Sequence, residues 1–90
     1  MSHPVTLPDL QSGDEPVRVS CWLVDVGDDI DEGDRVVEVL IRGITFDVSA
    51  PAAGRLTRIE KSFDMPVVPG DILGWIDVER GTPKGERGTR

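Results

Sequence analysis

The sequence predicts an all-β domain, and three observations support this prediction. Several stretches alternate apolar and polar residues with the two-residue period of a β-strand. Short polar segments containing glycine or proline separate these stretches, and such segments mark turns. No stretch keeps apolar residues at the three-to-four spacing of a helix without an interrupting Gly or Pro. We therefore expect strands joined by turns, with no helix.

A first strand is predicted for residues 17–24. Successive side chains of a strand point to opposite faces, so one face carries Val17, Val19, Cys21 and Leu23. Cys21 is then expected to point inward as a structural cysteine. The polar residues 25–34 follow, in which Gly27 and Gly33 predict a loop with a tight turn.

A β-hairpin is predicted around Arg42 and Gly43, which separate the runs V-V-E-V-L-I and I-T-F-D-V-S. Two alternating apolar runs separated by two residues, the second a glycine, indicate a tight hairpin. Gly43 is expected to adopt positive φ. Because Arg42 disfavours positive φ, we expect a type II turn or a type I turn with a bulge, and not type I′. The side chains expected on one face are Val37, Val39, Ile41, Ile44, Phe46 and Val48; those expected on the other face are Glu38, Thr45 and Asp47.

The rest of the chain predicts two further strands and an internal repeat. Residues 55–59 and 72–79 alternate as strands, after a connector that contains Pro51. Asp29 precedes Gly33-Asp34 by four residues, and Asp64 precedes Gly70-Asp71 by six. This predicts two copies of one loop, turn and strand unit, about 37 residues apart, with a two-residue insertion in the second.

The expected domain spans residues 17–79, or 5–79 if Val5 and Leu7 belong to an edge strand. Residues 1–16 are expected to be partly ordered. Residues 80–90 contain no apolar residue and are expected to form a disordered basic tail.

Composition excludes several classes of function. Ninety residues with 38% apolar and 30% charged residues predict one small globular domain with a thin core. The net charge is −7, and residues 1–79 hold 16 acidic against 6 basic residues, which argues against nucleic acid as a partner. No apolar run approaches the ~20 residues of a membrane span, and one cysteine forms no internal disulfide. We expect a cytoplasmic protein that does not bind membranes.

No catalytic or metal-binding constellation is evident. The acidic run consists of Asp25, Asp28, Asp29, Asp31, Glu32 and Asp34. With Gly33 at position six of a calcium loop, Ile30 and Val39 fall at ligand positions three and twelve, so a solvated acidic loop is the better interpretation. Cys21 lacks a base, because the single histidine is His3 in the N-terminal segment. We expect no metal and no enzymatic activity.

Two tryptophans and two lysines remain to be interpreted. Trp22 and Trp75 are predicted on corresponding strands of the two halves, with at least one packed in the core. Lys61 and Lys84 are the two lysines of the chain, and both are expected to be solvated surface residues.

Four segments at matching spacing resemble the lipoyl and biotinyl carrier domains. They are W-L-V-x-V-G-D-x-I-x-x-G-D at 22–34, E-V at 38–39, F-D-V-S-A-P-A-A-G at 46–54 and P-G-D-I-L-G-W-I at 69–76. The resemblance covers roughly residues 5–79 and is to lipoyl-like domains of 2-oxo acid dehydrogenase acyltransferases. It implies a flattened β-barrel of two four-stranded antiparallel sheets with quasi-twofold symmetry, a barrel-sandwich hybrid.

The same resemblance implies a specific absence. In these families the modified lysine lies at the tip of the exposed hairpin, eight residues before the proline of the A-P motif. Counting back from Pro51 gives Gly43. Lipoyl domains carry Asp-Lys at the tip and biotinyl domains Met-Lys-Met, whereas this chain has Arg42-Gly43. Gly43 therefore marks a lost attachment position, and no lipoate or biotin is expected.

The resemblance predicts a non-catalytic interaction or docking module. It is expected to be a monomer whose partner is a dehydrogenase, carboxylase or ligase component. One alternative is a carrier domain of a 2-oxo acid dehydrogenase or biotin-dependent carboxylase, with a swinging arm attached elsewhere. Another is a structural barrel module of a larger assembly.

Overall fold

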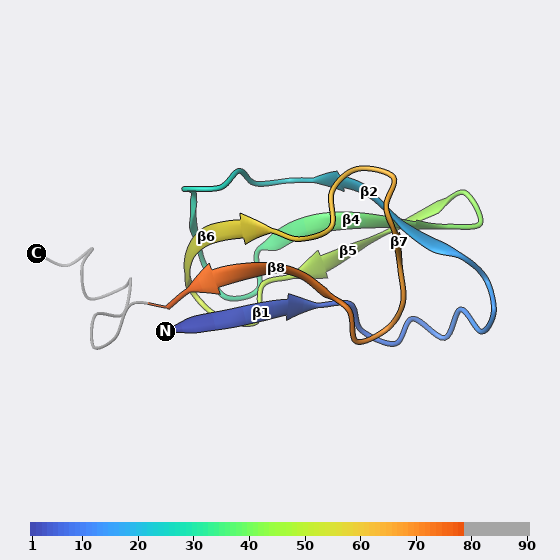
Figure 1. Cartoon of the computed structure of the whole chain (residues 1–90), viewed down its shortest axis with the longest axis horizontal. Coiled ribbons are helices and arrows are strands. Elements are labelled where there is room, and N and C mark those ends of the chain that lie inside the picture. The colour runs from blue at the N-terminus through green and yellow to red at the C-terminus, as the bar shows by residue number, and fades with distance from the viewer. Residues whose placement is uncertain (79–90) are drawn as a thin grey trace, which may run out of the picture.

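In the computed structural model, residues 1–78 are described and form eight β-strands with no helix. The strands are β1 (Ser2–Thr6), β2 (Val17–Trp22), β3 (Asp29–Ile30), β4 (Arg35–Ile41), β5 (Ile44–Ser49), β6 (Gly54–Ile59), β7 (Pro66–Val67) and β8 (Ile72–Asp77). They form two antiparallel sheets with strand orders β1-β8-β6-β3 and β5-β4-β2-β7 (Figure 1). This confirms the all-β fold of two four-stranded sheets. The basic tail predicted for residues 80–90 lies outside the described residues.

Within residues 1–78, no helix is present that could cross a membrane.

The two halves of the chain are related by quasi-twofold symmetry. Replacing β1, β2, β3 and β4 by β5, β6, β7 and β8, and the reverse, converts the strand order of one sheet into that of the other. The turn at residues 25–28 therefore corresponds to that at 62–65, and the turn at 31–34 to that at 68–71. Both pairs lie 37 positions apart, so the expected two-residue insertion in the second half was wrong.

The four corresponding turns share one backbone geometry. In three of them the fourth residue is an aspartate whose carboxylate accepts the N–H three residues earlier. The donor and acceptor residues are Asp25 and Asp28 at 2.8 Å, Asp31 and Asp34 at 2.9 Å, and Val68 and Asp71 at 2.9 Å. The third residue has positive φ, at 100° in Gly27, 90° in Gly33 and 93° in Gly70. The turn at 62–65 has Asp64 at this third position, with φ 67°, and Met65 at the fourth.

The core lies between the sheets and is almost entirely aliphatic. Its fully or nearly fully buried members come from both halves: Val5, Leu7, Val17, Val19, Ile30, Val36, Val37, Val39, Ile41, Val48, Ala50, Leu56, Val67, Leu73 and Ile76. The strands β3 and β7 were not expected, because each has only two residues; β3 lies in the loop predicted for residues 25–34, and β7 lies in a segment for which no strand was predicted. Each nevertheless contributes one buried side chain, Ile30 and Val67.

A β-bulge in β2 reverses the expected orientation of Cys21. Val19 pairs with Val39 and Cys21 pairs with Glu38, so Ser20 is an extra residue in β2. Beyond the bulge the alternation shifts by one residue. The prediction that Cys21 and Leu23 face the core was therefore wrong, and both are exposed.

The two tryptophans do not occupy corresponding strands, contrary to the prediction, because β2 corresponds to β6 and β8 to β4. Trp22 in β2 packs against the core and donates its Nε1–H to the Lys61 carbonyl at 2.8 Å. It lies directly against Gly74 of β8, where an added Cβ would be 2.7 Å from the Trp22 ring. Trp75 is half-buried and donates Nε1–H to Glu60 Oε2 at 3.0 Å.

Candidate functional site at the hairpin end

The hairpin predicted from the sequence is present, with Ile41 paired to Ile44 and a two-residue turn between them. Arg42 has φ 53° and Gly43 has φ 77°. Positive φ at both central residues is the pattern of a type I′ turn, so the expectation of type II or type I was wrong. A type I′ turn matches the right-handed twist of the two strands. That match offsets the cost of placing Arg42 in the left-handed region, which is about 1 kcal/mol.

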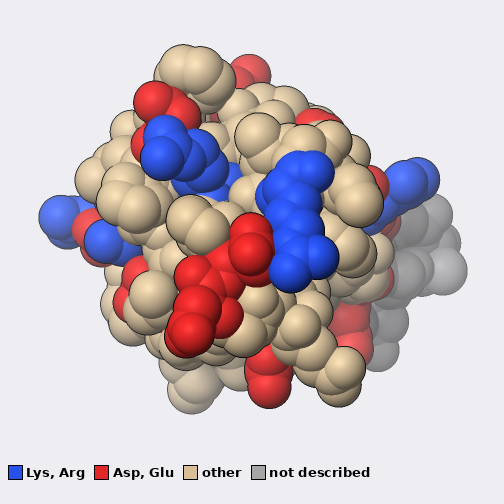
Figure 2. Space-filling view, turned by 90° about the vertical axis from the view of Figure 1, so that its right-hand side faces the viewer, with Lys and Arg blue, Asp and Glu red and all other residues tan. Residues whose placement is uncertain are grey.

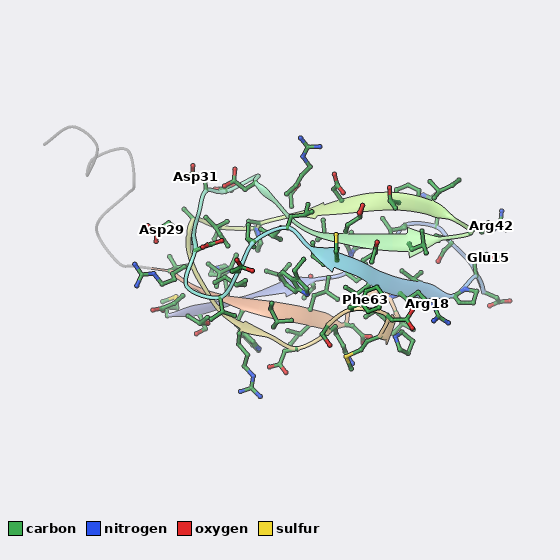
Figure 3. All side chains as sticks on the ribbon, turned by 90° about the horizontal axis from the view of Figure 1, so that it is seen from above. Glu15, Arg18, Asp29, Asp31, Arg42 and Phe63 are labelled. Carbon is green, nitrogen blue, oxygen red and sulfur yellow. The ribbon has the colours of Figure 1, made fainter. Side chains whose placement is uncertain are left out.

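Arg42 is held at the tip by an ion pair with Glu15, with 3.3 Å between Arg42 Nε and Glu15 Oε1. The two side chains are 66% and 40% exposed. Glu15 belongs to the connection between β1 and β2, which lies beside the hairpin at the same end of the molecule (Figure 3). A pair this exposed contributes at most about 1 kcal/mol to the free energy of unfolding. The sequence analysis did not identify Glu15 as a neighbour of the tip.

Replacing Gly43 by a residue with a side chain is disfavoured by the backbone conformation and not by lack of space. A Cβ added at Gly43 would meet no atom within 4 Å. Its φ of 77° lies in the region that residues with a side chain rarely adopt. A side chain at this position would therefore point into open solvent, at a conformational cost.

Lys61 follows the end of β6, whereas the hairpin tip joins β4 to β5. Lys61 is half-buried, and not a fully solvated residue as expected. Its backbone N–H donates to the Leu73 carbonyl at 3.1 Å, and its own carbonyl accepts the Trp22 indole N–H. Lys84 lies outside the described residues.

The hairpin end of the molecule carries mixed charge among uncharged surface. Figure 2 faces this end and shows basic and acidic side chains lying next to one another, with uncharged surface around them. Arg18 pairs with Asp64, at 3.0 Å between Nη1 and Oδ1, near the exposed Phe63 (Figure 3). The surface is therefore neither a uniform basic patch nor a uniform acidic one.

The six hairpin side chains predicted to share one face do share it, because Val37 pairs with Val48, Val39 with Phe46 and Ile41 with Ile44. Four of them are buried, whereas Ile44 and Phe46 are exposed. These two side chains are 58% and 40% exposed, although they pair with the buried Ile41 and Val39. The reason is that β5 is an edge strand of its sheet, so no strand of the sheet covers its far side.

An acidic row crosses the other face of the same sheet. Cys21 pairs with Glu38 of β4, and Glu38 pairs with Asp47 of β5. Desolvation raises the pKa of the Cys21 thiol, and the negative charges of Glu38 and Asp47 act in the same direction. The cation of Arg35 contacts the row, with 3.3 Å from Nη1 to Asp47 Oδ2.

The residues considered for catalysis are not brought together. His3 lies in β1, paired with Ile76, whereas Cys21 lies in the other sheet. In the acidic run, Asp29 pairs with Arg55, at 3.5 Å between Nε and Oδ1, and the carboxylates of Asp28 and Asp34 are engaged in the turns described above. Among residues 1–78, no three His, Cys, Asp or Glu side chains form a group that could hold a metal ion.

Comparison with known sequences identifies the family. Residues 3–76 match the biotin/lipoyl family, described as "biotin-requiring enzyme". The chain is 33% identical over 78 residues to the lipoamide acyltransferase component of the branched-chain alpha-keto acid dehydrogenase complex of Pseudomonas aeruginosa. That match covers 87% of this chain and 18% of the relative, so the chain spans a small part of the relative's length.

Solved structures of low sequence identity share the fold. The urea carboxylase of Kluyveromyces lactis superposes with a TM-score of 0.71 at 19% identity, over 86% of this chain and 6% of that enzyme. The lipoyl domain of the 2-oxoglutarate dehydrogenase complex from Azotobacter vinelandii superposes with a TM-score of 0.66 at 20% identity, over 83% of this chain and 95% of that domain. The match of residues 3–76 and the shared fold together establish that this chain belongs to the biotin/lipoyl family.

Proposed function

We propose that this chain is a lipoyl/biotinyl-type domain without a modifiable lysine, acting as a non-catalytic protein-interaction module. Domains of this family carry covalent lipoate or biotin and interact with dehydrogenase or carboxylase enzymes. Their attachment chemistry requires a lysine amine presented by the chain. The observation that carries the proposal is the composition of the hairpin tip, which is Arg42 and Gly43.

The tip residues do not fit a covalently attached cofactor. Gly43 has no side chain, and the Arg42 guanidinium stays protonated and is a poor nucleophile for acyl transfer. The Arg42 side chain is moreover engaged with Glu15. We therefore derive no carrier step through this hairpin.

Lys61 is the one lysine among residues 1–78, and it is the residue on which a carrier role would depend. It is half-buried and follows β6, and its main chain is fixed by hydrogen bonds to Leu73 and Trp22. A ligase that recognises a protruding hairpin tip would not find that geometry at Lys61. This favours the interaction role over a carrier with its arm attached elsewhere.

Intact mass spectrometry tests the proposal directly. The full chain is co-expressed with lipoate ligase and biotin ligase, with lipoate and biotin supplied, beside an authentic lipoyl domain as positive control. We expect the unmodified mass for this chain and a modified mass for the control. A mass gain of one lipoyl or biotinyl group, mapped to Lys61 or Lys84, would restore the carrier role.

A gain-of-function variant tests the assignment of the tip. Arg42→Asp combined with Gly43→Lys is expected to create a substrate for lipoate ligase. The lysine would adopt positive φ at a cost of about 1–2 kcal/mol, so its folding is checked by circular dichroism. Gly70→Lys, a glycine of similar φ in another turn, is the matched control and should stay unmodified. A folded double variant that gains no mass would remove Gly43 as the attachment-equivalent position.

Affinity capture with the unmodified chain separates an interaction module from a purely structural barrel. Recovery of a dehydrogenase or carboxylase component, lost when the folded state is destroyed, supports the interaction role. Recovery of no specific partner from the native host supports a structural role.

A further inference from the structure

The strand β5 is an open edge of a sheet. It pairs with β4 on one side, and no other described strand pairs with it on the opposite side. Figure 3 shows β5 as the outermost ribbon beside β4, leading away from the hairpin that carries Arg42. Because sheets extend by adding strands to unpaired edges, this edge is able to accept another extended chain.

The pairing register determines which backbone groups face the open side. Ile41 and Ile44 close a two-residue hairpin, so they exchange both hydrogen bonds, and the bonded pairs then alternate along the strands. The backbone groups of Phe46 therefore bond to β4. The backbone N–H and C=O groups of Thr45 and Asp47 point to the open edge, where no described strand pairs with them.

The corresponding edge strand of the other sheet is blocked. Pro4 of β1 lies opposite Trp75, in the place where Asp47 of β5 lies opposite Glu38. Proline has no backbone N–H, and proline on an edge strand is a known protection against strand addition. Asp47 retains its N–H, so quasi-symmetry gives two edges of similar geometry with one blocked and one open.

The side chains around the open edge define what an added strand would contact. On the inner side it would meet the exposed Ile44 and Phe46. On the outer side it would meet Asp47, which lies opposite Glu38 with Arg35 as its cation. Directly opposed like charges are unfavourable, and a cation from a third strand would relieve them.

We propose that the β5 edge binds an extended segment of a partner protein in which apolar residues alternate with lysine or arginine. The inference gives the partner chemistry of the proposed interaction role and rests on that role. Apolar side chains of the segment cover Ile44 and Phe46, its cations face Asp47 and Glu38, and its backbone pairs with Thr45 and Asp47.

Titration of the isotope-labelled full chain with short peptides tests this inference. The probes are acetyl-Val-Lys-Val-Lys-Val-amide and acetyl-Val-Glu-Val-Glu-Val-amide, at low salt. We expect the lysine peptide to bind at least about tenfold more tightly than the glutamate peptide, with amide shifts concentrated on β5. Shifts spread over the whole acidic surface would overturn the proposal.

Backbone methylation separates strand addition from simple charge attraction. N-methylation of the two peptide residues whose N–H groups face β5 should abolish binding, whereas methylation of the intervening residues should leave it intact. Equal effects of both methylation patterns contradict the inference, because attraction between charges does not depend on which N–H group is methylated.

A charge-reversal pair of variants provides the residue-level control. Asp47→Lys should lower the affinity for the lysine peptide by about tenfold and raise the affinity for the glutamate peptide. Asp29→Lys, at an exposed aspartate of β3 in the other sheet that pairs with Arg55, makes the same change in net charge and should leave both affinities near the wild type. Equal responses of the two variants would assign the binding to net charge alone.

Sedimentation of the free chain checks the other occupant of this edge. Concentration-dependent dimers abolished by Phe46→Lys would mean that a second copy fills the β5 edge, which overturns the proposal of a partner segment. Acylation found by intact mass would overturn the interaction role, and peptide binding at β5 is measured independently of it.

Discussion

The turns at residues 25–34 and 62–71 share a backbone geometry but differ in surface chemistry, since the first pair is acidic and the second is mostly uncharged. The six acids of the acidic run are all exposed in the first pair of turns, and Asp29 and Asp31 lie at the end of the molecule opposite Arg42 (Figure 3). Moving 37 positions along the chain replaces five of these acids, and the residues found there are Ser62, Met65, Pro66, Val68, Pro69 and the retained Asp71. The comparison teaches that the fold depends on a positive φ and one side-chain acceptor per turn. The remaining positions differ between the two halves.

The two halves also differ in how corresponding positions pack in the interior. A substitution at this packing contact should have the largest effect on the free energy of unfolding. Trp22 and Gly74 are in contact, and their counterparts 37 positions away are Ile59 and Val37. Gly74→Val should lower the free energy of unfolding by about 3 kcal/mol or more, because its Cβ would lie 2.7 Å from both the Trp22 ring and the Arg58 carbonyl oxygen. Urea unfolding followed by circular dichroism measures this loss.

The double variant Trp22→Ile with Gly74→Val copies the other half and is the control. We expect it to recover about half of the lost stability, since the ring that causes one of the two clashes is gone. No recovery would mean that the Arg58 carbonyl dominates the clash.

The third positions of the turns provide the next largest effect. Gly27→Ala should lower the free energy of unfolding by about 1 kcal/mol, because φ 100° is unfavourable for any residue with a Cβ. Asp64→Gly, at the corresponding position, should not lower it, because the relief of positive φ offsets the loss of an exposed ion pair with Arg18. Thermal unfolding of both variants at one pH makes the comparison. A similar loss of unfolding free energy in both variants would show that the Asp64 side chain makes stabilising interactions that outweigh the strain of its positive φ.

A smaller effect is expected at Met65, which stands where the other turns have aspartate. Its sulfur lies 3.2 Å from the Ser62 nitrogen and is a weak acceptor. Met65→Asp should raise the free energy of unfolding by about 0.5–1 kcal/mol through a stronger hydrogen bond to this N–H. The reverse substitution, Asp28→Met, should lower the free energy of unfolding by a similar amount. If both substitutions lower it, the fourth positions of the two turns are not equivalent.

The smallest effect concerns the reactivity of Cys21, whose counterpart in the other half is Arg58. Desolvation, together with Glu38 and Asp47, raises the thiol pKa, so less thiolate is present at pH 8 than in an unfolded chain. Alkylation by iodoacetamide should therefore be slower in the folded protein. Glu38→Gln should lower the thiol pKa and speed alkylation by a few fold, whereas Glu60→Gln, directly after β6 of the other sheet, should not change the rate. Folded-state stability attributable to this thiol is lost as pH rises through the raised pKa.

Local sequence signals predicted the parts of the fold that depend on local chemistry. The hairpin around Arg42 and Gly43 was located to the residue, because a glycine between two alternating runs leaves few other arrangements. The family resemblance supplied the two-sheet architecture. The tip residues were named from the sequence, and their role as an attachment-equivalent position stays a prediction.

The features that sequence reasoning missed all depend on contacts between distant segments. The bulge at Ser20 exists because β2 must match β4, so Cys21 could not be placed from alternation alone. Strands of two residues, such as β3 and β7, carry no period to detect. The exposure of Ile44 and Phe46 follows from the edge position of β5, which is set by strand order and not by strand sequence.

The contact between Met1 and Val78 is the symmetry counterpart of the hairpin turn. Val78 N–H donates to the Met1 carbonyl at 2.7 Å, and the Met1 amine pairs with Asp77 at 3.1 Å. Val78 and Met1 occupy the places that Ile41 and Ile44 hold at the other end. Joining Val78 to Met1 by a two-residue turn would therefore close the path of the described chain into a circle. A circular permutant that joins Val78 to Met1 through Asn-Gly and opens the chain between Arg42 and Gly43 should fold with its halves in reversed order. Such a molecule would present a chain terminus where its relatives present a loop.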